Sequence, residues 1–108
     1  MIDAVVIGAG PAGLMAAEEL GKAGHSVIVA DAMPSVGRKF LMAGKSGLNL
    51  TKDESEDAFR SAFGPEVPKA LSIALDRFGP KEVVDWAEAL GQPLFVGSTG
   101  RVFPRALK

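Results

Sequence analysis

Three glycines near the N-terminus have the spacing of a phosphate-binding loop. Gly8, Gly10 and Gly13 form the pattern G-x-G-x-x-G, and an acidic residue, Asp31, follows at about the 20-residue distance that dinucleotide folds use. In such a loop the first glycine permits a tight turn, the second lets backbone N–H groups approach a pyrophosphate, and the third lets a helix pack closely on a strand. The helix N-terminus adds free N–H donors and a partial positive charge. The spacing therefore predicts a dinucleotide site, with the ribose hydroxyls on Asp31.

The segments around these glycines have the patterns of the elements that such a site needs. Residues 2–7 are a β-branched apolar run typical of a strand buried on both faces, and residues 11–22 repeat small side chains at helical spacing. Residues 26–30 form a second apolar run, which ends at Asp31. We therefore predict a right-handed βαβ unit within residues 1–50 and an α/β, Rossmann-like fold. A glycine-rich turn in an unrelated α/β domain is the alternative.

The segment that follows Asp31 is less regular. Residues 32–50 are rich in glycine and basic residues without clear periodicity, which indicates a loop with a short helix near residues 39–43. Thr51 and Glu54 then have the spacing of a capping box, so a helix is expected to begin at Thr51.

The last part of the chain, residues 51–108, is predicted to be a helical segment followed by a β-hairpin. Pro80 suits the first position of a helix because its missing N–H costs nothing there, and Gly91 marks the end of that helix. Short apolar runs on both sides of residues 97–100 predict two strands joined by a glycine-rich turn.

Composition excludes several classes of site. The chain has 108 residues, no cysteine and one histidine, which excludes disulfides, thiolate metal sites and multi-histidine metal sites. Twelve basic residues balance thirteen acidic ones, which argues against a broad nucleic-acid surface. No apolar run approaches the roughly 20 residues that cross a bilayer, and the N-terminus lacks a secretory pattern. We expect a cytoplasmic protein with no metal, no membrane and no nucleic-acid partner.

The residues after Asp31 carry a resemblance to known flavoproteins. Gly37-Arg38-Lys39 resembles the glycine-basic segment that runs beneath the cofactor in FAD-binding proteins of the glutathione-reductase type. More narrowly, residues 37–51 (GRKFLMAGKSGLNLT) resemble the signature G-R-K-x-x-x-S-G-G-G-R-C-N-x-T of the HI0933-like, or BaiN-like, NAD(P)/FAD-dependent oxidoreductases, and residues 91–95 and 100–104 resemble a later segment of that family. Lys45-Ser46-Gly47-Leu48 stands where the common form has G-G-R-C, so no role of that arginine or cysteine is carried over.

The resemblance implies a function for the chain. It implies the N-terminal, FAD-binding part of a flavin-dependent oxidoreductase, with NAD(P)H as a possible reductant and a small molecule as substrate. Members of the family are several times longer, and two apolar parallel strands cannot cover both of their faces alone. We therefore expect an incomplete fold and a fragment that is inactive alone. The oligomeric state stays open.

Thirteen residues are the candidate cofactor contacts, and they comprise the glycine loop, the acidic strand end and the basic loop that follows it. Lys39 is the preferred basic contact, and Asn49 is a candidate partner of the flavin or the ribityl chain. No catalytic acid or base is assigned, because in a flavoenzyme the ring carries the hydride chemistry. The set is Gly8, Ala9, Gly10, Pro11, Ala12, Gly13, Asp31, Ala32, Gly37, Arg38, Lys39, Lys45 and Asn49.

Two other functions fit the same residues. The first is NAD binding in a dehydrogenase, for which Asp31 disfavours the 2′-phosphate of NADP. The second is a non-catalytic flavin- or nucleotide-binding module. Separate titrations of FAD and NAD, and turnover of a reduced nicotinamide, distinguish the three.

Overall fold

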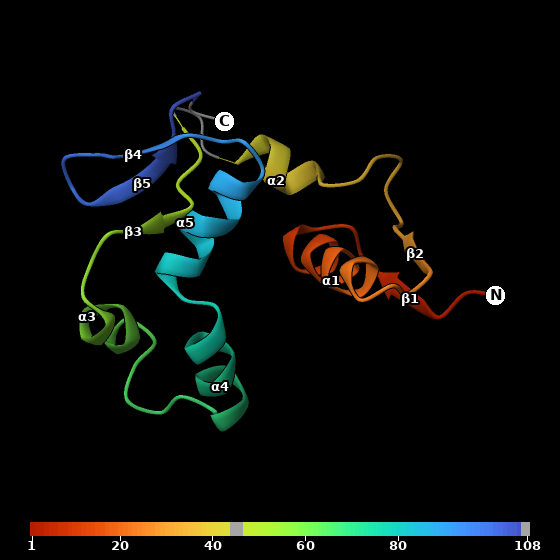
Figure 1. Ribbon diagram of the computed structural model, residues 1–108, viewed down its shortest axis with the longest axis horizontal. Helices are drawn as coiled ribbons and strands as arrows, with labels where there is room; N and C mark the ends of the chain where they lie inside the picture. Colours follow the sequence, from red (N-terminus) through yellow and green to blue (C-terminus); the bar gives the residue numbers. More distant parts are fainter. Residues whose placement is uncertain (44–46, 107–108) are drawn as a thin grey trace. The chain divides into compact units, whose positions relative to one another are not determined.

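The computed structural model describes residues 1–43 and 47–106 and divides the chain into two compact units, Met1–Ala43 and Gly44–Lys108 (Figure 1). The first unit contains β1 (Ala4–Ile7), α1 (Pro11–Lys22), β2 (Val27–Ala30) and α2 (Arg38–Met42). The second contains β3 (Thr51–Lys52), α3 (Glu56–Ser61), α4 (Lys69–Arg77), α5 (Pro80–Ala89), β4 (Leu94–Val96) and β5 (Arg101–Pro104). The short helix expected near residues 39–43 is α2.

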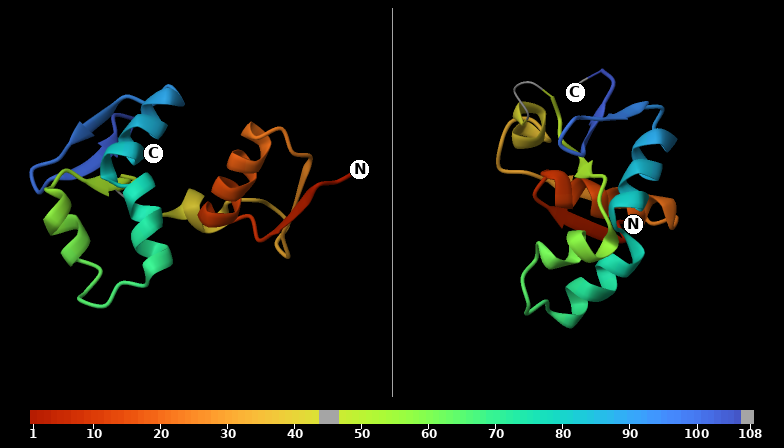
Figure 2. Two further views of the ribbon diagram at one scale, coloured as in Figure 1. Left: turned by 60° about the horizontal axis from the view of Figure 1, so that its bottom comes forward. Right: turned by 90° about the vertical axis from the view of Figure 1, so that its left-hand side faces the viewer.

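The first unit is a β-strand, a helix and a parallel β-strand, as predicted. β1 and β2 pair in parallel, in a register that runs from Ala4 opposite Val27 to Ile7 opposite Ala30. α1 contacts both strands and lies beside them in both figures (Figure 2). The connection between β1 and α1 is therefore the glycine loop, and Asp31 directly follows β2.

The prediction that these strands are buried on both faces is wrong for the described residues. Burial alternates along β1 and β2, because successive side chains of a strand point to opposite faces and α1 covers one of them. On the other face, Val5, Ile7 and Ile28 are 59%, 89% and 48% exposed. The apolar pattern of the strands thus exceeds what α1 alone covers.

The second unit is built on a three-stranded antiparallel sheet with the order β3-β5-β4. β4 and β5 form the predicted hairpin, with Phe95 opposite Phe103 and Val96 opposite Val102. β3 adds on the other side of β5, with Thr51 opposite Val102. Val102 is 3% exposed at the centre of this sheet.

The predicted helix start at Thr51 is wrong, because Thr51 begins β3. Residues 97–100 form the turn that precedes β5, and β5 pairs with Thr51. Next to this pairing, the Asp53 N–H donates to the Gly100 carbonyl at 2.7 Å. The next helix, α3, is capped instead by Ser55, whose Oγ accepts a hydrogen bond from the Ala58 N–H at 3.1 Å. Pairing with β5 thus outweighs the local capping pattern.

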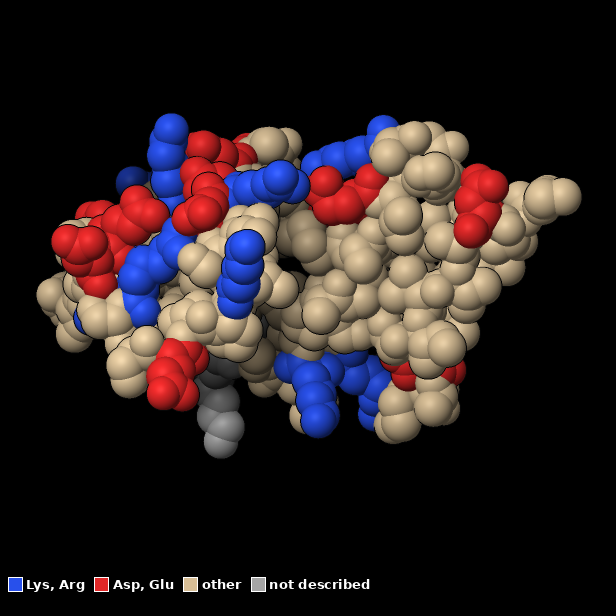
Figure 3. All heavy atoms as spheres, turned by 90° about the horizontal axis from the view of Figure 1, so that it is seen from below, with Lys and Arg blue, Asp and Glu red and all other residues tan. Residues whose placement is uncertain are grey.

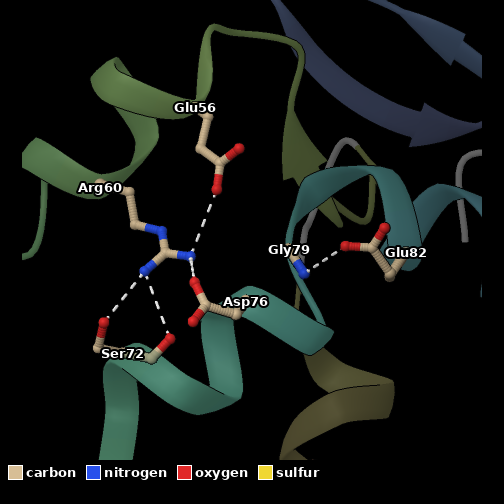
Figure 4. A network of polar contacts seen from close by, with 6 residues as sticks. All are labelled: Glu56, Arg60, Ser72, Asp76, Gly79 and Glu82. Carbon is tan, nitrogen blue, oxygen red and sulfur yellow. Dashed lines mark hydrogen bonds and ion pairs between the residues drawn. The ribbon is translucent and has the colours of Figure 1, made fainter. Parts of the chain in front are cut away.

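Arg60 links α3 to α4. Its guanidinium donates to Asp76 and to the hydroxyl and carbonyl oxygens of Ser72 on α4, and to Glu56 on its own helix (Figure 4). The hydrogen bond to the Asp76 carboxylate raises the pKa of Arg60 above its ordinary value. These contacts join α3 to α4.

α5 begins and ends where the sequence predicts. Pro80 is at its first position, and the Glu82 side chain accepts a hydrogen bond from the Gly79 N–H at 2.9 Å (Figure 4). Gly91 follows the helix with φ +80°, a left-handed conformation that glycine adopts without strain. Ala87 of this helix is buried, whereas Leu90, which follows the helix, is 56% exposed. In the described part of the chain, no helix combines the length and apolar character that crossing a membrane requires.

Candidate dinucleotide-binding site

The loop between β1 and α1 is held in a tight turn by Gly8. This residue has φ +102°, a region that side-chain-bearing residues rarely adopt, and its N–H donates to the Ala30 carbonyl of β2 at 2.7 Å. The chain therefore turns out of the sheet at the position where the pattern requires a glycine.

Gly13 is the point of closest approach between helix and strand. A Cβ atom at this position would lie 1.8 Å from the Gly8 carbonyl oxygen and 3.2 Å from a methyl carbon of Val6. Only glycine fits such a contact, because backbone atoms cannot move aside as a flexible side chain can. The third glycine thus sets how closely α1 lies on β1.

Gly10 is open where Gly13 is crowded. It is the residue that precedes α1, it is exposed, and a Cβ built on it would meet no atom within 4 Å. The first hydrogen bond of the helix runs from the Leu14 N–H to the Gly10 carbonyl, at 2.9 Å. The N–H groups of Ala12 and Gly13 precede that bond, and Pro11 has no N–H.

This end of α1 has the electrostatics of an anion site. Its capping residue, Gly10, has no side chain to occupy the free N–H groups, and the first turn contains no acidic residue. The helix dipole places roughly half a positive charge there. Space beside Gly10 and free donors at Ala12 and Gly13 together suit a phosphate group.

Asp31 ties β2 to the glycine loop. Its Oδ2 accepts a hydrogen bond from the Ala9 N–H at 2.7 Å, and its Oδ1 accepts one from the Met33 N–H at 2.8 Å. The bond from the Met33 N–H lowers the pKa of Asp31 below its ordinary 3.8, and the bond from the Ala9 N–H lowers it further. Each carboxylate oxygen keeps a further lone pair, and the residue is exposed, so Asp31 can also accept from a sugar hydroxyl.

Gly37 holds Ala9 from its other side. The Gly37 N–H donates to the Ala9 carbonyl at 2.7 Å, and Gly37 adopts φ +62° immediately before α2. Ala9 is 1% exposed, and its N–H and carbonyl are both engaged, by Asp31 and Gly37 respectively. The glycine loop is therefore clamped between the end of β2 and the start of α2.

The remaining candidate cofactor contacts lie outside the loop between β1 and α1. Ala32 and Lys39 are exposed in the first unit, and the guanidinium of Arg38 lies 3.3 Å from the Ser35 hydroxyl. Asn49 is exposed in the second unit. Lys45 lies outside the described residues.

The structure also identifies a contributor that the sequence reasoning missed. Met33 supplies a backbone N–H that donates to Oδ1 of Asp31. The signal was present, because an aspartate that accepts from the N–H two residues later is the Asx-turn typical of this residue. Asp31 is thus a loop-shaping residue as well as a candidate ribose contact.

Comparison with known proteins identifies the family. The model of the HI0933-like protein Rossmann domain matches residues 2–108. The chain belongs to the HI0933-like family. Its Rossmann βαβ unit, with the glycine loop between β1 and α1, is therefore the nucleotide-binding part of an HI0933-like protein, and the predicted fold class is confirmed.

Two curated relatives carry the same name. The chain is 32% identical over 101 residues to a ribosomal RNA dihydrouridine synthase of Escherichia coli K12, an alignment that covers 94% of this chain and 24% of that protein. It is 41% identical over 66 residues to a ribosomal RNA dihydrouridine synthase of Haemophilus influenzae, covering 61% of this chain and 16% of that protein. The matched part of this HI0933-like chain thus spans 24% of the first relative's length and 16% of the second relative's length.

Proposed function

We propose that this HI0933-like chain binds the ADP half of FAD and forms the cofactor-binding part of a flavin-dependent oxidoreductase. The pyrophosphate would lie against Gly10 and the free N–H groups of Ala12 and Gly13, and the adenosine ribose beside Asp31. The observation that carries this proposal is the contrast between two glycines: Gly13 is closed by backbone, whereas Gly10 faces open space at the helix end. A Cβ at Gly10 would occupy the space that the phosphates need.

The basic segment after Asp31 is proposed to continue the cofactor site. Gly37 positions the start of α2 against the loop, and Arg38 and Lys39 follow it in the first turn of that helix. Their charges suit the phosphates or the electron-rich edge of the flavin. Lys45 and Asn49, which follow α2 in the sequence, are proposed as further contacts, as is Ala32 next to Asp31.

FAD would supply hydride and electron transfer, while the chain's own residues bind and orient it. The proposal is tested by purifying the natural protein that carries this chain and recording its visible absorption. We expect a flavin spectrum, and FAD identified after release from the denatured protein. A colourless preparation that FAD cannot reconstitute, with NAD binding instead, would favour the NAD-dependent alternative.

The substrate has two candidate classes. A small molecule, with NAD(P)H as reductant, is the expectation from the family resemblance, and the balanced charge of the chain argues against a broad nucleic-acid surface. The names of both relatives favour a second class, a uridine in RNA, since those proteins are named for making dihydrouridine in ribosomal RNA. Reduction of the uracil double bond takes up two electrons and two protons, which a reduced flavin and a proton donor can provide.

One assay separates these substrate classes. The purified protein is reduced with NADPH or NADH and incubated with RNA prepared from cells that lack it. Dihydrouridine in the RNA, detected by mass spectrometry, would support the RNA substrate. Oxidation of the nicotinamide with an artificial electron acceptor but no change in the RNA would favour the small molecule. Flavin binding without any turnover would favour a non-catalytic module.

A further inference from the structure

The sheet of the second unit has one face toward α5 and one face away from it. A cavity of about 460 Å³ lies on the α5 side, and Thr51, Val96 and Val102 line it from the strands while Val84 and Glu88 line it from the helix. Lys52 and Phe95 also line this cavity, whereas Arg101 and Phe103 do not. Residues paired across neighbouring strands share a face, so the register places Lys52 with Arg101 and Phe95 with Phe103. We call the face that carries these four residues the aromatic-basic face.

Two aromatic rings form one half of the aromatic-basic face. Phe95 and Phe103 are directly opposite each other on β4 and β5, and their rings stack with centroids 5.6 Å apart and planes inclined by 29°. Both residues are partly exposed. Stacked rings on a sheet surface are a platform on which a planar base can lie, since every nucleobase has a π-face.

Two cations form the other half. Lys52 and Arg101 are opposite each other on β3 and β5, and Arg101 is two residues from Phe103 on the same strand. Lys52 has an acidic neighbour, Glu54, at 3.9 Å. For Arg101, which is exposed, the described residues provide neither an ion pair nor a side-chain hydrogen bond. Its guanidinium is therefore available to a partner.

This arrangement differs from the charges elsewhere on the second unit. Arg60 is occupied by Asp76, Glu56 and Ser72, and acidic and basic side chains lie next to one another on the side drawn in Figure 3. Only a local cluster can then attract an anion, because neighbouring opposite charges cancel at a distance. On the aromatic-basic face an unpaired arginine adjoins an aromatic pair.

We propose that the aromatic-basic face binds single-stranded RNA, with a base stacked on Phe95 and Phe103 and a backbone phosphate paired with Arg101. This inference rests on the RNA substrate proposed above and adds where the chain holds it. Aromatic stacking and phosphate neutralisation are the two contributions by which proteins bind single strands without reading their sequence. A protein partner of acidic chemistry would use Arg101 but would gain less from a flat aromatic pair.

The test measures binding of a fluorescein-labelled oligouridine to the full chain by fluorescence anisotropy, at several salt concentrations. Arg101→Gln should weaken binding and reduce the slope of log affinity against log salt by about 0.7, the value for one phosphate contact on a single strand. Arg101→Lys should restore that slope. Phe103→Leu should weaken binding by roughly 5- to 100-fold, as for loss of one stacked base, and leave the slope nearly unchanged.

Matched controls lie on α4 and at its end. Arg77→Gln removes one positive charge and Phe78→Leu removes one exposed ring, both away from the aromatic-basic face, so neither should change the affinity. Circular dichroism establishes that each variant is folded, and Phe95→Leu replaces Phe103→Leu if the latter is not.

Each remaining outcome overturns the proposal in a recognisable way. If the wild-type chain binds no RNA, the proposed RNA substrate fails together with this face. If wild type binds RNA but Arg101→Gln and Phe103→Leu bind equally well, only the assignment to this face fails. If sedimentation shows a dimer that Phe103→Leu dissociates, a second copy covers the face and the proposal is wrong.

Discussion

The Oδ2 atom of Asp31 lies 2.7 Å from the backbone nitrogen of Ala9, so the end of β2 holds the glycine loop at the end of β1. Ala9 is almost fully buried, and its carbonyl accepts from Gly37 on its other side. Asp31 therefore shapes the loop in addition to being a candidate ribose contact. It fixes Ala9, which precedes Gly10, and thereby the place where a phosphate would meet the helix.

Asp31 should make the stability of the chain depend on pH. Because its pKa in the folded state is below the ordinary 3.8, its contribution is present above that pH and is lost as the pH falls through the folded-state pKa. Asp31→Asn puts an amide group beside two N–H donors and should destabilise the chain at neutral pH. Urea unfolding from pH 7 downward should show the difference between wild type and variant shrinking with acid. A difference that is constant over this range would contradict the hydrogen-bonding role.

Gly13 should tolerate no side chain. In Gly13→Ala the methyl group would overlap the Gly8 carbonyl oxygen, and we expect a loss of about 3 kcal/mol in the free energy of unfolding, at the upper end for overpacking. Gly21→Ala is the matched control in the same helix, because a Cβ there meets nothing within 4 Å. It should stabilise the chain by up to about 1 kcal/mol. Equal effects of the two substitutions in urea unfolding would contradict the close helix–strand contact.

Ser55 should anchor the start of α3. Ser55→Ala removes the acceptor of the Ala58 N–H, which typically costs about 1 kcal/mol, and should speed hydrogen exchange of the α3 amides. Thr51→Ala, at the position first expected to cap a helix, should leave exchange in α3 unchanged because Thr51 lies in β3. The reverse order of effects would restore the capping box at Thr51.

The first unit could be predicted from its sequence because local patterns and the fold agree there. Gly8, Gly10 and Gly13 each meet a different backbone requirement, and the apolar runs on both sides have the lengths of strands. The exposed face of Val5 and Ile7 was not predicted, because a continuous apolar run does not say which neighbour covers it.

The second unit was harder for a physical reason. Residues 51–54 satisfy a local helix-start pattern, yet Thr51 and Lys52 pair with β5, which is about 50 positions away in the chain. A pairing at that sequence distance leaves no mark in a short window. The hairpin of β4 and β5 was predictable because its turn and both strands are adjacent. The clamp on Ala9 was likewise hidden, since it joins two loops that are separate in the sequence, the β1–α1 loop and the β2–α2 loop.

The central claim is tested most directly by isothermal titration calorimetry of FAD into the full chain. Wild type, Gly10→Val and Gly24→Ala are compared. Wild type should bind FAD, and Gly10→Val should fold normally yet lose binding, because its side chain fills the space at the N-terminus of α1. Gly24→Ala should lose about 1 kcal/mol of stability, since Gly24 has φ +87°, but should keep the wild-type affinity. Equal affinity of wild type and Gly10→Val for FAD would show that the phosphates do not rest against this loop.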